Sequence, residues 1–154
     1  MDESSRDRAV QDLLSAVIGL VSNWNAVSTQ GSVAAAVGVD VPAGDVRALY
    51  TVGLRGGAIR PAALAEEIQQ TRPTTSKVVA RLEALGLVAR ERGAGDGRAV
   101  QVALTADGRD AYERLVAAGA AMVGEAMADT TTAEIDLVAA ASRKLTGGFA
   151  TRRG

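Results

Sequence analysis

The stretch GAGDGRAVQVALT, from Gly93 to Thr105, places a glycine-rich turn directly in front of an alternating apolar run. Its second half, residues 99–104, repeats with a period of two, which predicts a β-strand. The segment LVARER, residues 87–92, predicts a partner strand, and Asp96-Gly97 suits the turn between them. A phosphate-binding loop does not fit this order, because such a loop opens a helix and carries Lys-Ser or Lys-Thr. We therefore expect a β-hairpin, either a plain one or one whose tip acts through Arg98.

Three helices are predicted before this hairpin. The segment TRPTTSKVVARLEALG predicts a helix over 71–85, with Thr71 as N-cap and Gly86 as its stop. Two shorter helices, over 43–54 and 61–69, come before it. The order helix, helix, helix, strand, turn, strand is that of a winged helix-turn-helix. Its predicted core residues are Val46, Leu49, Tyr50, Val52, Leu64, Ile68, Val78, Val79, Leu82, Leu85, Val100, Val102 and Leu104.

Long helices are predicted on both sides of this domain. They cover about residues 5–28, 106–128 and 133–147, with a short Ala/Val helix before Gly38 and a frayed tail after 147. The fold class is therefore mainly α with a small β-hairpin wing. We expect a DNA-binding domain at 39–105 and a helical dimerisation region formed by 1–38 and 106–154. The terminal helices carry more apolar surface than one small winged domain can cover, which favours a homodimer. Their predicted inward residues are Val10, Leu13, Leu14, Val17, Ile18, Val21, Trp24, Tyr112, Leu115, Val116, Met122, Val123, Met127, Ile135, Val138 and Leu145.

The composition excludes several classes of function. The chain contains no cysteine and no histidine, which removes thiol chemistry, Ser-His-Asp catalysis and the usual zinc ligands. Glu66 and Glu67 are adjacent on a predicted helix and point about 100° apart, so they form no acid–base pair. We therefore expect neither an enzyme nor a metal or cofactor site. No apolar run reaches the roughly 18 residues of a membrane span, and the polar N-terminus does not resemble a signal peptide, so we expect a cytoplasmic protein without a membrane partner.

Positive charge is concentrated where a winged helix would meet DNA. The whole chain has a net charge of -1, but residues 68–98 contain six cations and three acids, a net of +3. Hydroxyl and cationic side chains at the start of the 71–85 helix suit phosphate oxygens and base edges, although they also suit a solvated helix start. Arg98, next to Asp96, could enter a minor groove. The residues at the helix start are Arg72, Thr74, Thr75, Ser76 and Lys77.

These motifs together resemble the MarR family of bacterial transcriptional regulators. The resemblance covers about residues 40–110 and rests on ALAEEI, TRPTTSKVVARLEALGLVAR and DGRAVQVALTADG. It implies a homodimeric regulator whose recognition helix, 71–85, enters the major groove, with the wing, 87–104, at the minor groove. Base-edge contacts would come from Arg72, Thr74, Thr75, Ser76 and Lys77, and Asp96 would orient Arg98 in the minor groove. Arg81, Arg90 and Arg92 are candidates for either phosphate contact or internal pairing. The wing tip carries less charge than in many relatives, and residues 28–44 match poorly.

The resemblance also implies a small aromatic or lipophilic effector between the dimerisation and DNA-binding regions. A tryptophan on the apolar face of a helix, such as Trp24, is more often an ordinary core residue, and Arg47 and Arg55 could equally be solvated or face DNA. The candidate lining residues are Asn23, Trp24, Arg47, Tyr50 and Arg55.

The predicted function is a dimeric, sequence-specific DNA-binding regulator, a ligand-responsive repressor that recognises a pseudo-palindromic operator in double-stranded DNA. The alternative is a winged-helix module that binds a protein or a ligand but no specific DNA. Salt dependence separates the two, because DNA binding weakens steeply as ions are added.

Overall fold

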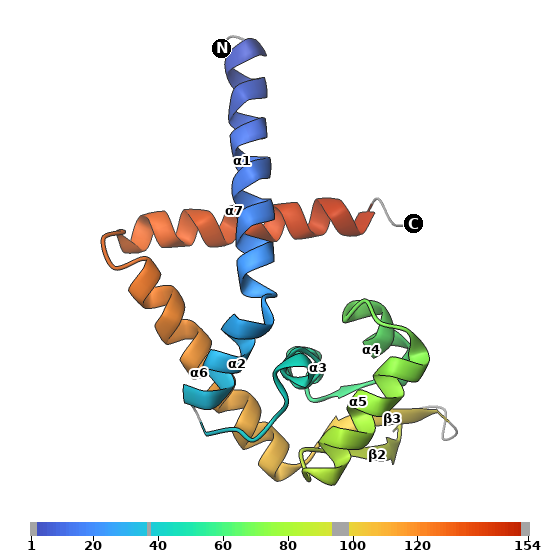
Figure 1. The fold of residues 1–154 in the computed structure, drawn as a ribbon. Helices are drawn as coiled ribbons and strands as arrows, with labels where there is room; N and C mark the ends of the chain where they lie inside the picture. The colour runs from blue at the N-terminus through green and yellow to red at the C-terminus, as the bar shows by residue number, and fades with distance from the viewer. Residues whose placement is uncertain (1–2, 37, 94–98, 152–154) are drawn as a thin grey trace. The chain divides into compact units, whose positions relative to one another are not determined.

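The structure, a computed structural model, describes residues 3–36, 38–93 and 99–151. It divides the chain into two compact units, Met1–Ala118 and Gly119–Gly154. The described elements agree with the predicted fold class, which is mainly α with a hairpin wing in a winged helix-turn-helix (Figure 1). The helices are α1 (Glu3–Trp24), α2 (Val27–Ala36), α3 (Ala43–Leu54), α4 (Pro61–Glu67), α5 (Arg72–Ala84), α6 (Ala106–Ala126) and α7 (Thr132–Thr151). The strands are β1 (Ala58–Ile59), β2 (Val88–Arg92) and β3 (Val100–Leu104).

The hairpin belongs to a small antiparallel sheet with the strand order β1-β3-β2. In the central strand, Ala103 pairs with Ala58 of β1 on one side and with Ala89 of β2 on the other. Strand β1 was not predicted, because its two residues are too short to display a period. Val100 belongs to the same alternating set as the buried Val102 and Leu104, but its side chain is 46% exposed because it lines an open groove beside α5.

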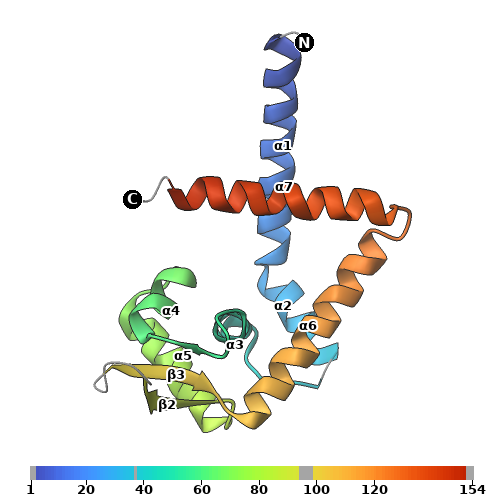
Figure 2. The same cartoon turned by 180° about the vertical axis from the view of Figure 1, so that it is seen from behind.

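The core of the first unit forms around α3. This helix contacts α2, α4, α5 and strands β1 and β3, and Figure 2 shows it from the side opposite to Figure 1. Burial of the predicted aliphatic residues of α3, α4 and α5 is confirmed, whereas Leu85, which follows the last turn of α5, is 40% exposed. The largest buried side chains are Leu49, Leu64, Leu82, Leu115, Val52, Val78, Val79, Val102 and Thr75.

Glycines end the two helices that frame the DNA-binding segment. Gly56 and Gly57 follow α3 with φ of 80° and 92°, and Gly86 follows α5 with φ of 72°. This left-handed conformation is costly for residues with a Cβ atom. Beyond Gly86, the Leu87 N–H donates to the Leu82 carbonyl at 3.0 Å and satisfies one of the free carbonyls at the end of α5. The predicted stop at Gly86 is therefore confirmed, and these glycines allow strands β1 and β2 to start within a few residues of the helix ends.

The terminal helices differ from their predicted lengths. Helix α1 ends at Trp24, and α2 begins at Val27, so the predicted helix to residue 28 is interrupted. The predicted fraying was also wrong as far as Thr151, where α7 ends, and residues 152–154 of that tail lie outside the described residues. The backbone hydrogen-bond ladder continues through Gly147-Gly148 despite the low helix propensity of glycine, and the Thr151 hydroxyl donates to the Gly147 carbonyl at 2.9 Å.

Within the single chain, the apolar stripes of α1 and α7 are uncovered. On α1, Leu14 and Ile18 are each 56% exposed, and α7 has no buried residue among those described. Of the predicted inward positions on these two helices, Val17 and Leu145 are half-buried and the others are exposed. Trp24, which is 37% exposed, is not a core residue. Across residues 3–36, 38–93 and 99–151, no helix has both the length and the apolarity that a membrane span requires.

Candidate nucleic-acid interface

The start of α5 is capped by threonine hydroxyls. The Thr71 hydroxyl accepts a hydrogen bond from the Thr74 N–H at 3.3 Å, and the two hydroxyl oxygens lie 2.9 Å apart. Thr71 is therefore the N-cap that the sequence predicts, and Pro73 stands in the first turn, where its missing N–H costs nothing. The free backbone N–H groups and the positive end of the helix dipole at such a start favour negatively charged ligands.

The predicted DNA-contact residues of α5 divide between two faces. Arg72, Ser76 and Lys77 are exposed, and Thr74 is exposed although its hydroxyl contacts that of Thr71. Thr75 lies on the opposite, buried face: it is 2% exposed, and its hydroxyl donates to the Thr71 carbonyl at 3.0 Å. The structure therefore places four of the five residues on the solvent side and turns Thr75 towards the core.

A groove of about 470 Å³ separates the start of α4 from α5 and the hairpin. Three arginines from three different elements line it: Arg60 before α4, Arg72 on α5 and Arg90 on β2. Val79 and Val102 contribute to its apolar floor. An arginine-lined groove beside a helix N-terminus suits a phosphate group, because guanidinium groups bind phosphate through paired hydrogen bonds.

Arg81 turns away from the solvent face of α5 towards α3. Its Nε and Nη2 atoms donate to the two carboxylate oxygens of Asp45 at 2.6 and 2.7 Å. The Asp45 side chain is 3% exposed, whereas that of Arg81 is 49% exposed. These hydrogen bonds raise the pKa of the Arg81 guanidinium above its usual value. The sequence left two roles open for Arg81, phosphate contact and internal pairing, and in the structure Arg81 is paired internally with Asp45.

Arg90 also has an internal partner. Its Nε atom lies 3.3 Å from a carboxylate oxygen of Glu83, which connects β2 to α5 across two half-exposed side chains. Asp96 and Arg98 lie outside the described residues, so their assignment to the wing tip stays a prediction. The described part of the hairpin closes with the Gly93 N–H donating to the Ala99 carbonyl at 2.9 Å. Among the described residues, neither Arg72 nor Lys77 forms an ion pair.

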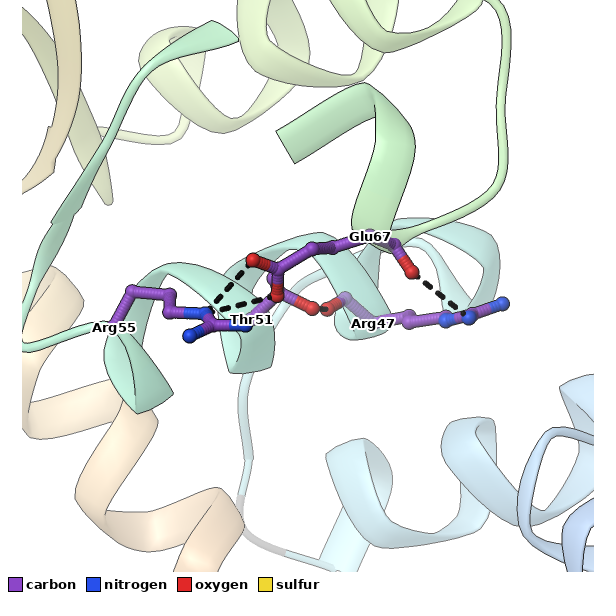
Figure 3. A network of polar contacts seen from close by, with 4 residues as sticks. All are labelled: Arg47, Thr51, Arg55 and Glu67. Atoms are coloured by element: carbon purple, nitrogen blue, oxygen red, sulfur yellow. Dashed lines mark hydrogen bonds and ion pairs between the residues drawn. The ribbon is translucent and has the colours of Figure 1, made fainter. Parts of the chain in front are cut away.

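Two of the residues predicted to line a ligand pocket instead join α3 to α4 (Figure 3). Arg55 Nε lies 2.8 and 3.0 Å from the carboxylate oxygens of Glu67, and Arg47 Nη2 donates to the Glu67 carbonyl at 3.2 Å. The Thr51 hydroxyl donates to the Arg47 carbonyl at 2.8 Å and lies in the same cluster. Arg47 and Arg55 therefore hold the first helix of the helix-turn-helix against α3.

The other predicted pocket residues lie elsewhere. Tyr50 meets Tyr112 of α6 edge-to-face with ring centroids 5.6 Å apart, and burial, together with Tyr112, raises the pKa of Tyr50. Asn23 and Trp24 lie at the exposed end of α1, where the Asn23 side-chain amide donates to the Gly19 carbonyl at 3.0 Å. Asn23 and Trp24 therefore lie on α1, Arg47 and Tyr50 lie on α3, and Arg55 directly follows α3, and their place in a ligand pocket stays a prediction.

Sequence reasoning missed two residues of this region, the groove residue Arg60 and the buried partner of Arg81, Asp45. Arg60 was not considered, because a single arginine before Pro61 carries no periodic signal. Asp45 lies four and seven residues before the buried Leu49 and Val52, so it falls on the apolar stripe of α3. A charged residue on an apolar stripe indicates a buried, paired group, and this signal could have identified Asp45 but not its partner.

Comparisons with known proteins agree with this geometry. Residues 38–99 match the family model described as MarR family. The fold is similar to that of a MarR family protein from Bacillus stearothermophilus, with a TM-score of 0.74 and 19% identity over 94% of this chain and 97% of that one. A MarR family transcriptional regulator from Silicibacter pomeroyi DSS has a TM-score of 0.69 and 18% identity over 96% and 93% of the two chains. The solved complex of NadR with 4-hydroxyphenylacetate has a TM-score of 0.62 and 23% identity over 83% and 89%.

The structural comparisons show the fold of the chain, and the family model matches part of its sequence. The fold is a winged helix-turn-helix with long terminal helices, the fold of solved MarR family regulators. Residues 38–99, which contain α3, β1, α4, α5 and β2, match the MarR family model, so the predicted resemblance is confirmed over that segment. No protein with a curated function matches the sequence.

Proposed function

We propose that this protein is a dimeric transcriptional regulator that binds a pseudo-palindromic operator in double-stranded DNA. In this proposal it is no enzyme, and it acts in the cytoplasm, where bacterial DNA is found. The observation that carries the proposal is the exposed start of α5, where Arg72 and Lys77 have no acidic partner among the described residues. The N-terminal turns of a recognition helix are the part that reads base edges in the major groove.

The groove beside α5 supports the same orientation. Arg60 and Arg90 line this groove together with Arg72, so a phosphate backbone that passes over the groove would meet guanidinium groups from α5, from β2 and from the residue before α4. Arg98 at the hairpin tip would then reach the adjacent minor groove, with Asp96 orienting it. Phosphate contacts fix the register, whereas base contacts from Arg72, Thr74, Ser76 and Lys77 would select the sequence.

The uncovered apolar faces of α1 and α7 support a dimer. Residues 1–38 and 106–154 would form the dimerisation region, and residues 39–105 would bind DNA. A second copy of the chain would cover the exposed stripes through a two-fold interface, and obligate interfaces of this kind bury on the order of 2,000 Å² or more. Two-fold symmetry would place two recognition helices about one DNA turn apart.

Selection of bound DNA from a random pool, at about physiological salt, tests the function. A pseudo-palindrome with half-sites roughly 10 base pairs apart is the expected product. Absence of any enriched sequence from a folded dimer would contradict the proposal and favour a module that binds a protein instead. Repression is the expected direction, and transcription from a promoter carrying the selected site measures it.

A small aromatic compound is the proposed effector. The support is the NadR structure, which was solved with 4-hydroxyphenylacetate. Trp24 is the only tryptophan of the chain, so its fluorescence reports directly on ligands that bind near α1. We expect quenching by at least one member of a panel of phenolic and lipophilic compounds. No quenching across the panel would place the effector site, if there is one, away from Trp24.

A further inference from the structure

Two ion pairs hold α5 on its two flanks. On one flank, Arg81 binds Asp45 of α3 through two short hydrogen bonds to a buried carboxylate. On the other flank, Glu83 meets Arg90 of β2 at 3.3 Å, with both side chains partly exposed. The first pair is the stronger constraint, because a paired fork geometry fixes direction as well as distance.

The placement of the Asp45–Arg81 pair suits both helices that it joins. Asp45 stands in the first turn of α3, and Arg81 stands in the last turn of α5. Each charge is therefore opposite in sign to the nearby end of its own helix dipole, which is favourable. The carboxylate is almost fully buried, and a buried charge without its partner is strongly unfavourable. Any tilt of α5 that separates Arg81 from α3 is therefore opposed by the cost of leaving the Asp45 carboxylate buried and unpaired.

We propose that Asp45 and Arg81 form a positioning pair that aims the recognition helix, and that Arg81 does not contact DNA. The inference rests on the proposed DNA-binding function. Arg72 lies nine residues before Arg81, which corresponds to about 13.5 Å along the helix. A rotation of about 10° at the paired end would move Arg72 by about 2 Å, which exceeds the precision that a base contact needs.

The competing interpretation is that Arg81 contacts a phosphate directly. The two interpretations predict opposite effects of Asp45→Asn. If Arg81 contacts DNA, the substitution removes a negative charge and frees the guanidinium, so binding to every DNA sequence tightens. If the pair positions α5, the substitution weakens binding to the operator and leaves binding to unrelated DNA nearly unchanged.

The experiment measures the affinity of the full chain for its selected operator and for a scrambled duplex between about 50 and 200 mM salt. The variants are Asp45→Asn, Arg81→Gln and the double variant, with Lys77→Gln as the control for a residue that touches DNA directly. We expect each single variant to lower the ratio of operator to scrambled affinity at least tenfold and to keep the wild-type salt slope. The double variant should lower the ratio no further than either single one, because both residues act through the same pair. Lys77→Gln should reduce the salt slope by about 0.9 for each phosphate group that the lysine neutralises in the wild type.

The ratio of operator to scrambled affinity distinguishes a variant that is partly unfolded from one in which α5 is misplaced. A partly unfolded variant loses affinity for both duplexes by the same factor, so its ratio stays at the wild-type value. Arg81→Lys is the second variant, because it keeps the charge and one bond to Asp45 but loses the fork, and its ratio should fall between wild type and Arg81→Gln. An unchanged ratio in folded variants, or tighter binding of Asp45→Asn to both duplexes, overturns the positioning role alone. A wild-type protein that binds both duplexes equally overturns the proposed function and the positioning role together.

Discussion

Truncation of Leu14 to alanine tests whether the uncovered face of α1 is a dimer interface. Leu14 and Val21 are seven residues apart on α1, so they share one face of the helix, and both are about half exposed in the single chain. Alanine has the highest helix propensity, so the substitution should not weaken α1 itself. Any loss of stabilising free energy should therefore appear as weaker association of the two chains.

The size of the expected loss follows from the exposed fraction of Leu14. Full burial of a leucine side chain stabilises by about 1.5–3 kcal/mol, so covering the 56% that is exposed contributes about 0.8–1.7 kcal/mol. A two-fold interface contains the residue twice, which gives about 1.7–3.4 kcal/mol per dimer. The dissociation constant of the dimer should then rise about 20- to 300-fold.

Sedimentation equilibrium of the wild type and of Leu14→Ala over a range of concentrations measures this change. Asp12→Ala is the matched control, because Asp12 lies about 200° around the helix from Leu14 and is exposed. The control should keep the wild-type dissociation constant. A Leu14→Ala protein whose constant stays within about twofold of wild type would refute the assignment of this face to the interface, since even the lower estimate from burial exceeds that change.

Three further outcomes are expected. In salt titrations by fluorescence anisotropy, Lys77→Gln should flatten the salt dependence of DNA binding by about 0.9 for each phosphate group that Lys77 also neutralises, and an unchanged slope would show that Lys77 neutralises none. Gly53→Ala should destabilise the first unit by about 1–3 kcal/mol in thermal melts, because a Cβ there would overlap the Tyr112 ring, whereas Gly44→Ala on the same helix meets open space and should be nearly neutral. Hydrogen bonds from Thr131 lower the pKa of Glu134, so its stabilising effect is complete above the unfolded pKa and is lost as the pH falls through the lower folded value. Glu134→Gln should therefore reduce the thermal stability of α7 at neutral pH but not in strong acid, and equal differences at both pH values would contradict the capping role.

Local patterns predicted most of the winged helix-turn-helix. Caps and stops such as Thr71, Gly86 and Thr105 act within a few residues, so the sequence displays them directly. Thr105, which directly precedes α6, accepts a hydrogen bond from the Gly108 N–H at 3.0 Å in the manner of an N-cap, and it also donates to the Gly86 carbonyl at 2.6 Å. The second bond joins the start of α6 to the end of α5 across 19 residues, and no local pattern indicates it.

The candidate site was less predictable than the fold, because side-chain direction depends on tertiary contacts. Thr75 stands among four residues that face solvent, but its position on the helix coincides with the stripe of Val78, Val79 and Leu82. The helical period alone could have separated Thr75 from its neighbours. The partners of Arg47 and Arg55 could not have been found in this way, because Glu67 becomes their neighbour only when α4 packs on α3.

The net charge counted along a segment of sequence overestimates the positive charge that is available to DNA. Residues 68–98 carry a net charge of +3, but Arg81 and Arg90 each face a carboxylate in the folded chain. Asp45 lies outside that segment, so the local count treats Arg81 as free although its charge is already neutralised by α3. The attraction that DNA would experience therefore concentrates on the start of α5, including Arg72, and on Arg60 across the neighbouring groove. This concentration means that the direction of α5, rather than the total charge of the segment, should control operator affinity.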